Sequence, residues 1–272
     1  MVKRKGFTFI EISLFLAVTG ALFIGIALGV SNSIFQQEYN DATQNFFEFL
    51  RSAYSKVSNP QSVGAGNSDY AIYGKLIVFG EDVDLLGETI PFKEQQVFSY
   101  DVVGGAAVGP SGDIKTLLKQ LKINVAFLEK NGNLIRGVEL SSPEKYTPRW
   151  EVGIENANGT EIKKSILIVR HPRSGTVNTL VYDGVIEANK IVRDAKNDAA
   201  GCIGQLSCTP VEELLTSVID SFNISEMDFC INPYGLGSSG AIPRRDIRIL
   251  KNARNASSVQ ILELEGENSI CL

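Results

Sequence analysis

The sequence predicts an α+β protein in which one long N-terminal α-helix packs on an antiparallel β-sheet head. An unbroken apolar run leads into an amphipathic helical pattern that continues to Ser58, and short alternating segments separated by turn residues follow it. The chain has 272 residues, of which 44% are hydrophobic and 21% charged, as in an ordinary globular protein. One globular head and one anchoring segment account for this length.

The first segment has the composition of a membrane anchor. Residues 7–30 form a largely apolar run of roughly 24 residues, enough to cross a bilayer as a helix. Three basic residues precede the run, and the next Lys or Arg is Arg51. Because basic residues favour the cytoplasmic side, we expect a single-pass protein with a cytoplasmic N-terminus, a run in contact with membrane lipid and an exported head. The three basic residues are Lys3, Arg4 and Lys5.

One carboxylate, Glu11, interrupts the apolar run. A charged side chain within the hydrocarbon costs on the order of 2.5 kcal/mol or more on insertion scales. Glu11 therefore needs a partner or a position where it is neutralised, and we expect an isolated anchor to offer it no partner.

The segment KGFTFIE at residues 5–11 resembles the class III signal of type IV prepilins and type II secretion pseudopilins. This resemblance implies that residues 1–6 are a leader, which a prepilin peptidase removes by cutting between Gly6 and Phe7. The same enzyme would methylate Phe7, and Glu11 would become the fifth residue of the mature chain. An inner-membrane assembly platform would then pack the subunit beside other pilins or pseudopilins.

In such a filament, the resemblance implies that Glu11 pairs with the ammonium of Phe7 on a neighbouring subunit, which would also set the axial register. The first proline is Pro60, so the apolar segment lacks the kinking proline of many major pilins, which favours a minor subunit or pseudopilin. The alternative is a plain signal anchor in which Glu11 lies close enough to the cytoplasmic interface to reach water.

Residues 31–58 continue the helix with an amphipathic pattern. Apolar residues recur at steps of three and four, so we expect this stripe to pack on the sheet of the head. Pro60 ends the helix at about Ser58, because proline disfavours a helical conformation in the preceding residue and lacks an N–H donor. The stripe consists of Phe35, Tyr39, Ala42, Phe46, Phe49, Ala53 and Val57.

Residues 60–272 read as one head domain made mainly of antiparallel strands. Turn signals such as Asn158-Gly159 and Pro172-Arg173-Ser174-Gly175 separate β-rich segments. The expected strands are residues 71–79, 96–103, 121–127, 134–140, 150–154, 165–171, 177–182, 227–230, 245–251 and 258–263.

One helix is expected to interrupt these strands. Thr209 is a suitable N-cap, Pro210 suits the first helical position and Glu212 completes a capping box, so the helix should run to about Phe222. It would lie within a long insertion at about residues 183–225. The order of strands and turns after this insertion resembles the closing strands of minor pseudopilins of type II secretion systems.

All four cysteines lie in the last quarter of the chain and lack the close paired spacings of zinc sites, so we expect no metal. Three complete pairings are possible. The first expectation joins Cys202 to Cys208 and Cys230 to Cys271, which would pin the C-terminal tail to a strand. Both bonds need an oxidising compartment, and without one the thiols would stay reduced.

The residues offer little support for an enzyme, and we expect no cofactor. His171 is the single histidine, it precedes a proline at the end of an expected strand, and no nucleophile-elbow pattern accompanies it. Gly104-Gly105 and Gly109-Pro110 lack the lysine of a phosphate-binding loop.

Two charged clusters are better interpreted as solvated surface than as ligand sites. The acidic cluster lacks the spacing of a calcium loop, and the basic cluster lacks aromatic residues that would stack on single-stranded DNA. The net charge of −5 also argues against a nucleic-acid coat. The acidic cluster is Glu81, Asp82 and Asp84, and the basic cluster is Arg244, Arg245, Arg248, Lys251 and Arg254.

The leading hypothesis is therefore a structural subunit of a type IV pilus or a type II secretion-like filament. The alternative is a membrane-anchored binding protein, such as an adhesin or a DNA-uptake receptor. The surface charge of the head and the genes neighbouring this one would discriminate between the two hypotheses. A third hypothesis is an exported enzyme, which would need a cleft containing His171 and an acidic partner.

Overall fold

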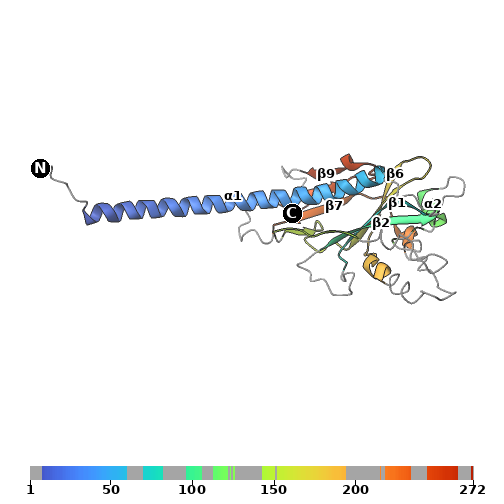
Figure 1. Ribbon diagram of the computed structural model, residues 1–272, viewed down its shortest axis with the longest axis horizontal. Helices are drawn as coiled ribbons and strands as arrows, with labels where there is room; N and C mark the ends of the chain where they lie inside the picture. The colour runs from blue at the N-terminus through green and yellow to red at the C-terminus, as the bar shows by residue number, and fades with distance from the viewer. Residues whose placement is uncertain are drawn as a thin grey trace.

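The described part of the chain consists of a long helix and a head containing two antiparallel sheets (Figure 1). This computed structural model describes residues 8–59, 70–81, 96–105, 113–121, 123, 125, 143–150, 152–193, 215, 218–233, 244–262 and 271. The helices are α1 (Phe9–Ser58) and α2 (Ile114–Gln120), with 3₁₀ turns η2 (Ile219–Ser221) and η3 (Ala256–Ser258). The strands are β1 (Tyr70–Phe79), β2 (Val97–Gly105), β3 (Glu144–Tyr146), β4 (Gly153–Glu155), β5 (Lys164–Arg170), β6 (Val177–Tyr182), β7 (Met227–Asn232), β8 (Arg245–Ile249) and β9 (Val259–Leu262).

The long helix α1 has clear boundaries at both ends. Thr8 is its N-cap, and its 50 residues extend about 75 Å at the usual rise per residue. At the other end the backbone N–H of Asn59 donates to the carbonyl of Ser55 at 3.0 Å, and Pro60 follows in the sequence. The helix thus ends where the sequence predicts, whereas Phe7, the predicted first residue, lies outside the described residues.

The head contains two sheets, where the sequence predicted one. The strand order is β3-β2-β1-β5-β6 in the five-stranded sheet and β4-β7-β8-β9 in the other, and all described pairs are antiparallel. Along the described strands, the chain returns to the five-stranded sheet between β4 and β5 and leaves it again between β6 and β7. It first passes between the sheets at the crossover from β3 to β4. Trp150 lies in this crossover with a φ of 56°, which residues other than glycine rarely adopt. Alternation along a segment predicts a strand, but it does not say which sheet the strand joins.

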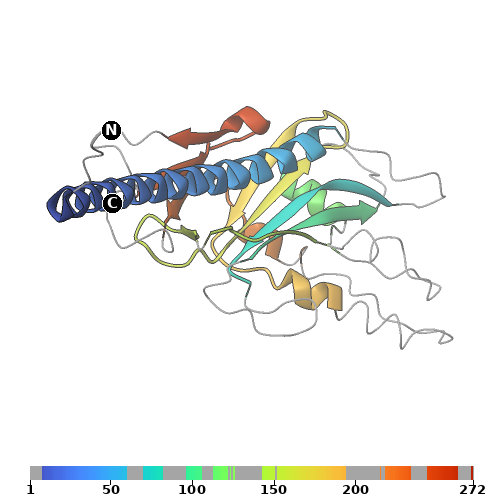
Figure 2. The ribbon, with the colours of Figure 1, turned by 60° about the vertical axis from the view of Figure 1, so that its left-hand side comes forward.

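The second half of α1 is buried in a core that it shares with both sheets. It contacts β1 and β5 of the five-stranded sheet and β9 of the other sheet, as Figure 2 shows. The centre of this core is aromatic, because the ring of Phe46 lies 6.3 Å from that of Phe79 and 5.3 Å from that of Phe229, centroid to centroid. Edge-to-face contacts at such distances stabilise aromatic pairs beyond their burial.

The predicted stripe of α1 is largely confirmed by burial. Its five buried members are Tyr39, Ala42, Phe46, Ala53 and Val57. Phe35 and Phe49 are only half-buried and pack at the edge of the core. Leu50 and Tyr54 lie outside the predicted stripe, yet both are completely buried. The buried face is wider than a single row because α1 touches two sheets at once.

A second core covers the opposite face of the five-stranded sheet. The central strands β1 and β5 therefore bury both faces: Ile77 and Ile166 face the first core, whereas Leu76 and Leu167 face the second. Residues 183–225 were expected to be an insertion, and several of their described side chains belong to this second core. These are Ile186, Ala188, Ile191, Val192, Leu215, Ile219 and Phe222.

Buried hydrogen bonds attach this segment to the sheet. The Tyr100 hydroxyl shares its one proton between Glu81 Oε2 at 3.1 Å and Asn189 Oδ1 at 2.5 Å, and the Asn189 backbone N–H donates to Glu81 Oε1 at 2.6 Å. Residues 188–193 are helical. The predicted helix at 209–222 has its start outside the described residues and ends with η2, capped by Phe222.

The strand predicted at residues 121–127 is wrong at its start. Leu121 is instead the C-cap of α2, whose N-cap Asp113 accepts hydrogen bonds from the backbone of Lys115 and Thr116. Ile123 and Val125 are buried, but neither belongs to a described strand. Both side chains lie in the second core. Phe127 and residues 134–140 lie outside the described residues.

We predict that the two halves of α1 differ in their effect on the stability of the head. Phe46→Ala should lower the free energy of unfolding by about 3–5 kcal/mol, because it leaves a cavity among aromatic rings. Phe15→Ala, at a position that is 67% exposed, should leave that free energy unchanged. Denaturant unfolding in detergent can be followed by the fluorescence of Trp150, the one tryptophan of the chain. Equal losses in both variants would contradict the two-part description of the helix.

Candidate functional site in the N-terminal helix

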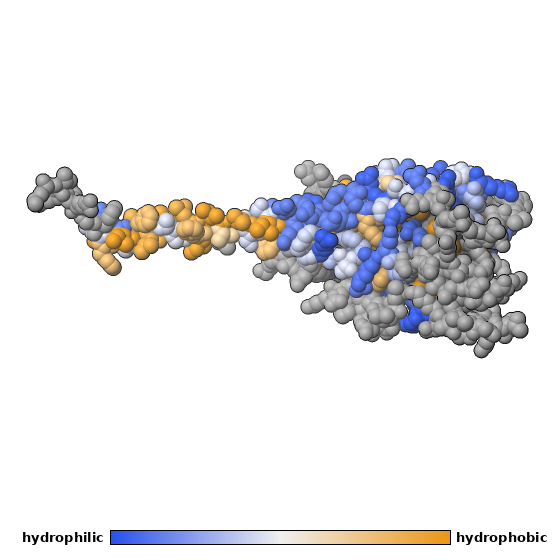
Figure 3. Space-filling view, viewed as in Figure 1, coloured by the Kyte–Doolittle hydropathy of each residue, from blue (hydrophilic) through white to orange (hydrophobic). Residues whose placement is uncertain are grey.

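The first half of α1 projects from the head with its apolar side chains exposed (Figures 1 and 3). Among the described residues, α1 is the one helix that is long and apolar enough to cross a membrane. Water is an unfavourable environment for such a surface, so it needs lipid or a protein neighbour. The large exposed apolar residues are Phe9, Ile10, Ile12, Leu14, Phe15, Leu16, Val18, Leu22, Phe23, Ile24, Ile26, Val30 and Ile34.

Glu11 forms a capping box with Thr8 in the first turn of α1. The Thr8 N–H and hydroxyl donate to Glu11 Oε2 at 2.8 and 3.0 Å, and Glu11 N–H donates back to Thr8 Oγ1 at 3.3 Å. The expectation that Glu11 has no partner in an isolated anchor is therefore wrong. The spacing Thr-x-x-Glu ahead of an apolar run is the sequence signal of this motif.

The capping box leaves one carboxylate oxygen of Glu11 available. Both of the hydrogen bonds that Glu11 accepts go to Oε2, and no described residue donates to Oε1. The side chain is exposed, and it lies at the positive end of the helix dipole, where a carboxylate is favoured. Glu11 is thus held in a fixed orientation and can still accept a donor from another molecule. Gly6 and Phe7, the expected processing residues, lie outside the described residues.

A row of small residues runs along the projecting half of α1 at steps of four. The sequence interpretation missed this row, although its spacing is visible in the sequence. A Cβ atom added at Gly25 or Gly29 would meet no other atom within 4 Å, so both glycines face open space. Small residues at this spacing allow two helices in a membrane to approach closely. The row consists of Ser13, Ala17, Ala21, Gly25, Gly29 and Ser33.

This small-residue row winds around α1. With 3.6 residues per turn, each four-residue step advances about 40°, so the row turns through about 200° between Ser13 and Ser33. A single straight partner helix cannot follow such a path over its whole length. The row therefore suits contact with at least two neighbouring helices at different heights.

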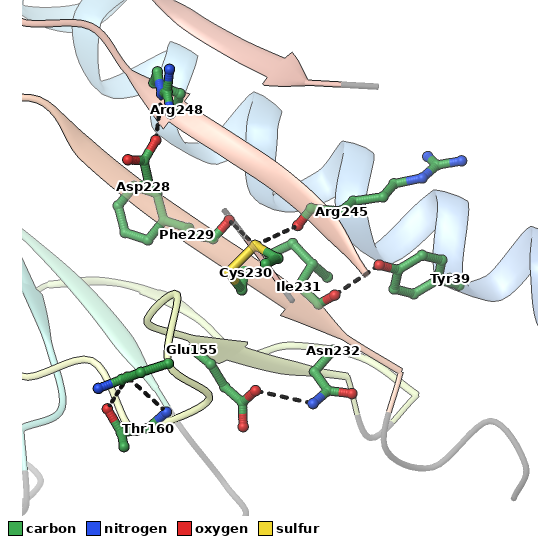
Figure 4. The surroundings of a disulfide bond; sticks show 12 residues. Tyr39, Glu155, Thr160, Asp228, Phe229, Cys230, Ile231, Asn232, Arg245 and Arg248 are labelled. Atoms are coloured by element: carbon green, nitrogen blue, oxygen red, sulfur yellow. Dashed lines mark hydrogen bonds and ion pairs between the residues drawn. A yellow bond between two sulfur atoms is a disulfide. The ribbon is translucent and has the colours of Figure 1, made fainter. Parts of the chain in front are cut away.

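The joint between the projecting half and the head lies at Tyr39 (Figure 4). Its hydroxyl donates to the carbonyl of Ile231 on β7 at 2.7 Å, and the guanidinium of Arg245 on β8 lies 5.6 Å from the centre of its ring. Burial raises the pKa of the Tyr39 phenol well above its usual range, and Arg245 opposes this shift only in part. The hydroxyl therefore remains a donor, and α1 is attached to two adjacent strands where it leaves the head.

A disulfide attaches Cys271 to the head beside the same two strands. The structure joins Cys230 of β7 to Cys271 with a Cα–Cα distance of 5.5 Å, the pairing expected first from the sequence. Cys271 Sγ also lies 3.9 Å from the carbonyl oxygen of Arg245. The bond thus holds Cys271 against β7. Cys202 and Cys208 lie outside the described residues.

Residues of the two charged clusters have structural contacts. Arg248 forms an ion pair with Asp228 at 2.5 Å, and the Arg245 guanidinium packs over the ring of Tyr39. Two members of the basic cluster thus make contacts within the protein. Lys251 and Arg254 are exposed. In the acidic cluster Glu81 is buried rather than solvated, which corrects the interpretation as an open loop, while Asp82 and Asp84 lie outside the described residues.

The single histidine stabilises a turn. His171 Nδ1 accepts hydrogen bonds from the backbone N–H groups of Arg173 and Ser174, at 3.3 and 3.1 Å. This turn connects β5 to β6 and contains Gly175, whose φ of 69° favours glycine. The turn occupies Nδ1, one of the two ring nitrogens that a Ser–His–acid constellation uses.

Comparison with known proteins identifies no relative of this chain. No protein-family model, curated protein or solved structure matches it. The function is therefore inferred from the geometry of α1 and from the way α1 is attached to the head.

Proposed function

We propose that this chain is a pilin or minor pseudopilin, a structural subunit of a type IV pilus or type II secretion-like filament. It would assemble through α1 after a prepilin peptidase cuts between Gly6 and Phe7. The observation that carries the proposal is the division of α1 into a buried half fixed on the head and an exposed apolar half. An inner-membrane assembly platform and neighbouring pilin-like subunits are the partners that this role requires.

The exposed half of α1 suits both a membrane and a filament core. Before assembly its apolar side chains would lie in lipid, and after assembly they would contact the helices of other subunits. The transfer from lipid to protein keeps these side chains out of water, so it involves no large hydrophobic penalty. Association would then depend on close packing, for which the small-residue row from Ser13 to Ser33 provides the surface.

Glu11 would provide the polar contact between subunits. Its capping box with Thr8 fixes the carboxylate near the end of the helix and leaves Oε1 without a described donor. In the processed chain the ammonium of Phe7 on a neighbouring subunit would donate to this oxygen. Two charges that are each unfavourable in an apolar core would thereby be paired.

Processing supplies the first test of the proposal. The mature chain should begin with methylated Phe7, and mass spectrometry of the N-terminal peptide from cells with an active prepilin peptidase measures this directly. Chains that keep Met1 in such cells, or chains cut beyond Val30, would contradict the proposal.

The second prediction separates the charge of Glu11 from its capping role. Glu11→Gln removes the charge but keeps an oxygen that can accept from Thr8, because glutamine also completes a capping box. If Glu11 pairs with a neighbour, this variant should insert in the membrane at normal or higher levels and fail to co-assemble, since an unpaired ammonium would remain in an apolar core.

Thr8→Ala is the matched control for this prediction. It removes the N-cap hydroxyl, a loss of about 1 kcal/mol to the helix, and keeps the charge of Glu11, so assembly should largely persist. Both variants are compared by the amount of subunit in sheared filaments relative to the membrane fraction. The opposite pattern, with assembly lost in Thr8→Ala and normal in Glu11→Gln, would show that Glu11 acts only as a cap.

The third prediction concerns the small-residue row. Gly25→Leu should reduce co-assembly strongly, because its side chain would separate helices that pack closely at this position. Ala27→Leu adds a similar side chain on the opposite side of α1 and should have little effect. Both substitutions keep the helix apolar, so membrane levels should match those of the unmodified chain. Equal loss of assembly in the two variants would refute the row as the contact surface.

A further inference from the structure

Three buried side chains form a line across the four-stranded sheet, on the face turned away from α1. Cys230 of β7 pairs in register with Glu155 of β4 on one side and with Asp246 of β8 on the other. Their exposed fractions are 0% for Cys230, 1% for Glu155 and 0% for Asp246. Figure 4 shows Cys230 and Glu155 in this region, near the joint at Tyr39. A disulfide and two buried carboxylates therefore share one enclosed surface.

Three metal-ligating atoms converge at one end of this line. The Sγ atoms of Cys230 and Cys271 and a carboxylate oxygen of Asp246 all lie within 4.8 Å of one another, and all three residues are buried. A tetrahedral zinc site with bonds of about 2.0–2.3 Å has its ligand atoms about 3.3–3.8 Å apart, which small side-chain movements would reach from here. Two thiolates with one carboxylate form a donor set suited to Zn²⁺.

We propose that, when the Cys230–Cys271 disulfide is reduced, Cys230, Cys271 and Asp246 bind a zinc ion. A dithiol or phosphine reductant supplies two electrons, the S–S bond breaks, and two thiols form. Binding of Zn²⁺ then releases one proton from each thiol, because the thiolate is the ligand. Water occupies the fourth position of the tetrahedron. Glu155 is not a ligand, because its carboxylate does not belong to the group of converging atoms.

If zinc binds in this way, Cys271 stays attached to the head whether the two cysteines are oxidised or reduced. The disulfide joins Cys271 to β7, and the zinc ion joins it to β7 and, through Asp246, to β8. Asp246 follows Arg245, whose guanidinium lies over Tyr39 at the joint with α1. Metal binding would therefore support the same joint in an envelope that does not oxidise thiols. Zinc binding at these residues does not depend on the proposed function, because it attaches Cys271 to the head and needs no other subunit.

The test uses the full chain in detergent with the substitutions Cys202→Ser and Cys208→Ser, which remove the other two thiols. After reduction with a phosphine, Co²⁺ serves as a spectroscopic substitute for Zn²⁺. We expect one equivalent of Co²⁺ to bind with a thiolate-to-metal charge-transfer band and tetrahedral absorption, and Zn²⁺ to displace it. The oxidised protein should show no such band. Zn²⁺ should raise the melting temperature of the reduced protein only.

Two carboxylate variants show whether the site is the one proposed. Asp246→Asn should weaken Co²⁺ binding about tenfold or more, whereas Glu155→Gln, which changes the buried carboxylate on the other flank of Cys230, should leave the affinity unchanged. Trp150 fluorescence reports whether each reduced variant is folded. Absence of the band in the reduced and folded protein, equal affinity in Asp246→Asn, or unfolding on reduction that the metal does not reverse would each overturn the proposal.

Discussion

The burial of one face of α1, from Tyr39 to Val57, against both sheets is the constraint on which the rest of the structure depends. These residues belong to the same uninterrupted helix as Glu11, and no proline or described break separates the two halves. Fixing the second half on the head therefore also fixes the direction of the apolar half and the position of its capped end. Whatever orients α1 therefore orients the head as well.

Local signals predicted the elements of this fold better than their assembly. Pro60 ends α1, and Gly175 forms the turn between β5 and β6, because in each case one residue restricts the backbone whatever its surroundings. The division into two sheets was not predicted, since it depends on pairings between distant strands and on the crossover at Trp150. The burial of Leu50 has the same origin, because only contact with both sheets widens the buried face.

Part of the candidate site could also be predicted from the sequence, because local signals mark it. Glu11 is conspicuous in an apolar run, but its capping by Thr8 needs the helix to begin at Phe9, two residues later than predicted. The small-residue row is a pattern of spacing and required no structure. The line of Glu155, Cys230 and Asp246 is different, because only the register of three strands brings these residues together.

The attachment of α1 uses strands that are well supported within their sheet. Tyr39 contacts β7 through the carbonyl of Ile231 and β8 through Arg245, and these are the two inner strands of the order β4-β7-β8-β9. An inner strand is hydrogen-bonded on both sides, so a pull along α1 is shared by the whole sheet, whereas an edge strand would have to resist it with bonds on one side only. The disulfide at Cys230 lies next to Ile231, whose carbonyl accepts the hydrogen bond from Tyr39. A force applied along α1 would thus enter the head beside a covalent cross-link.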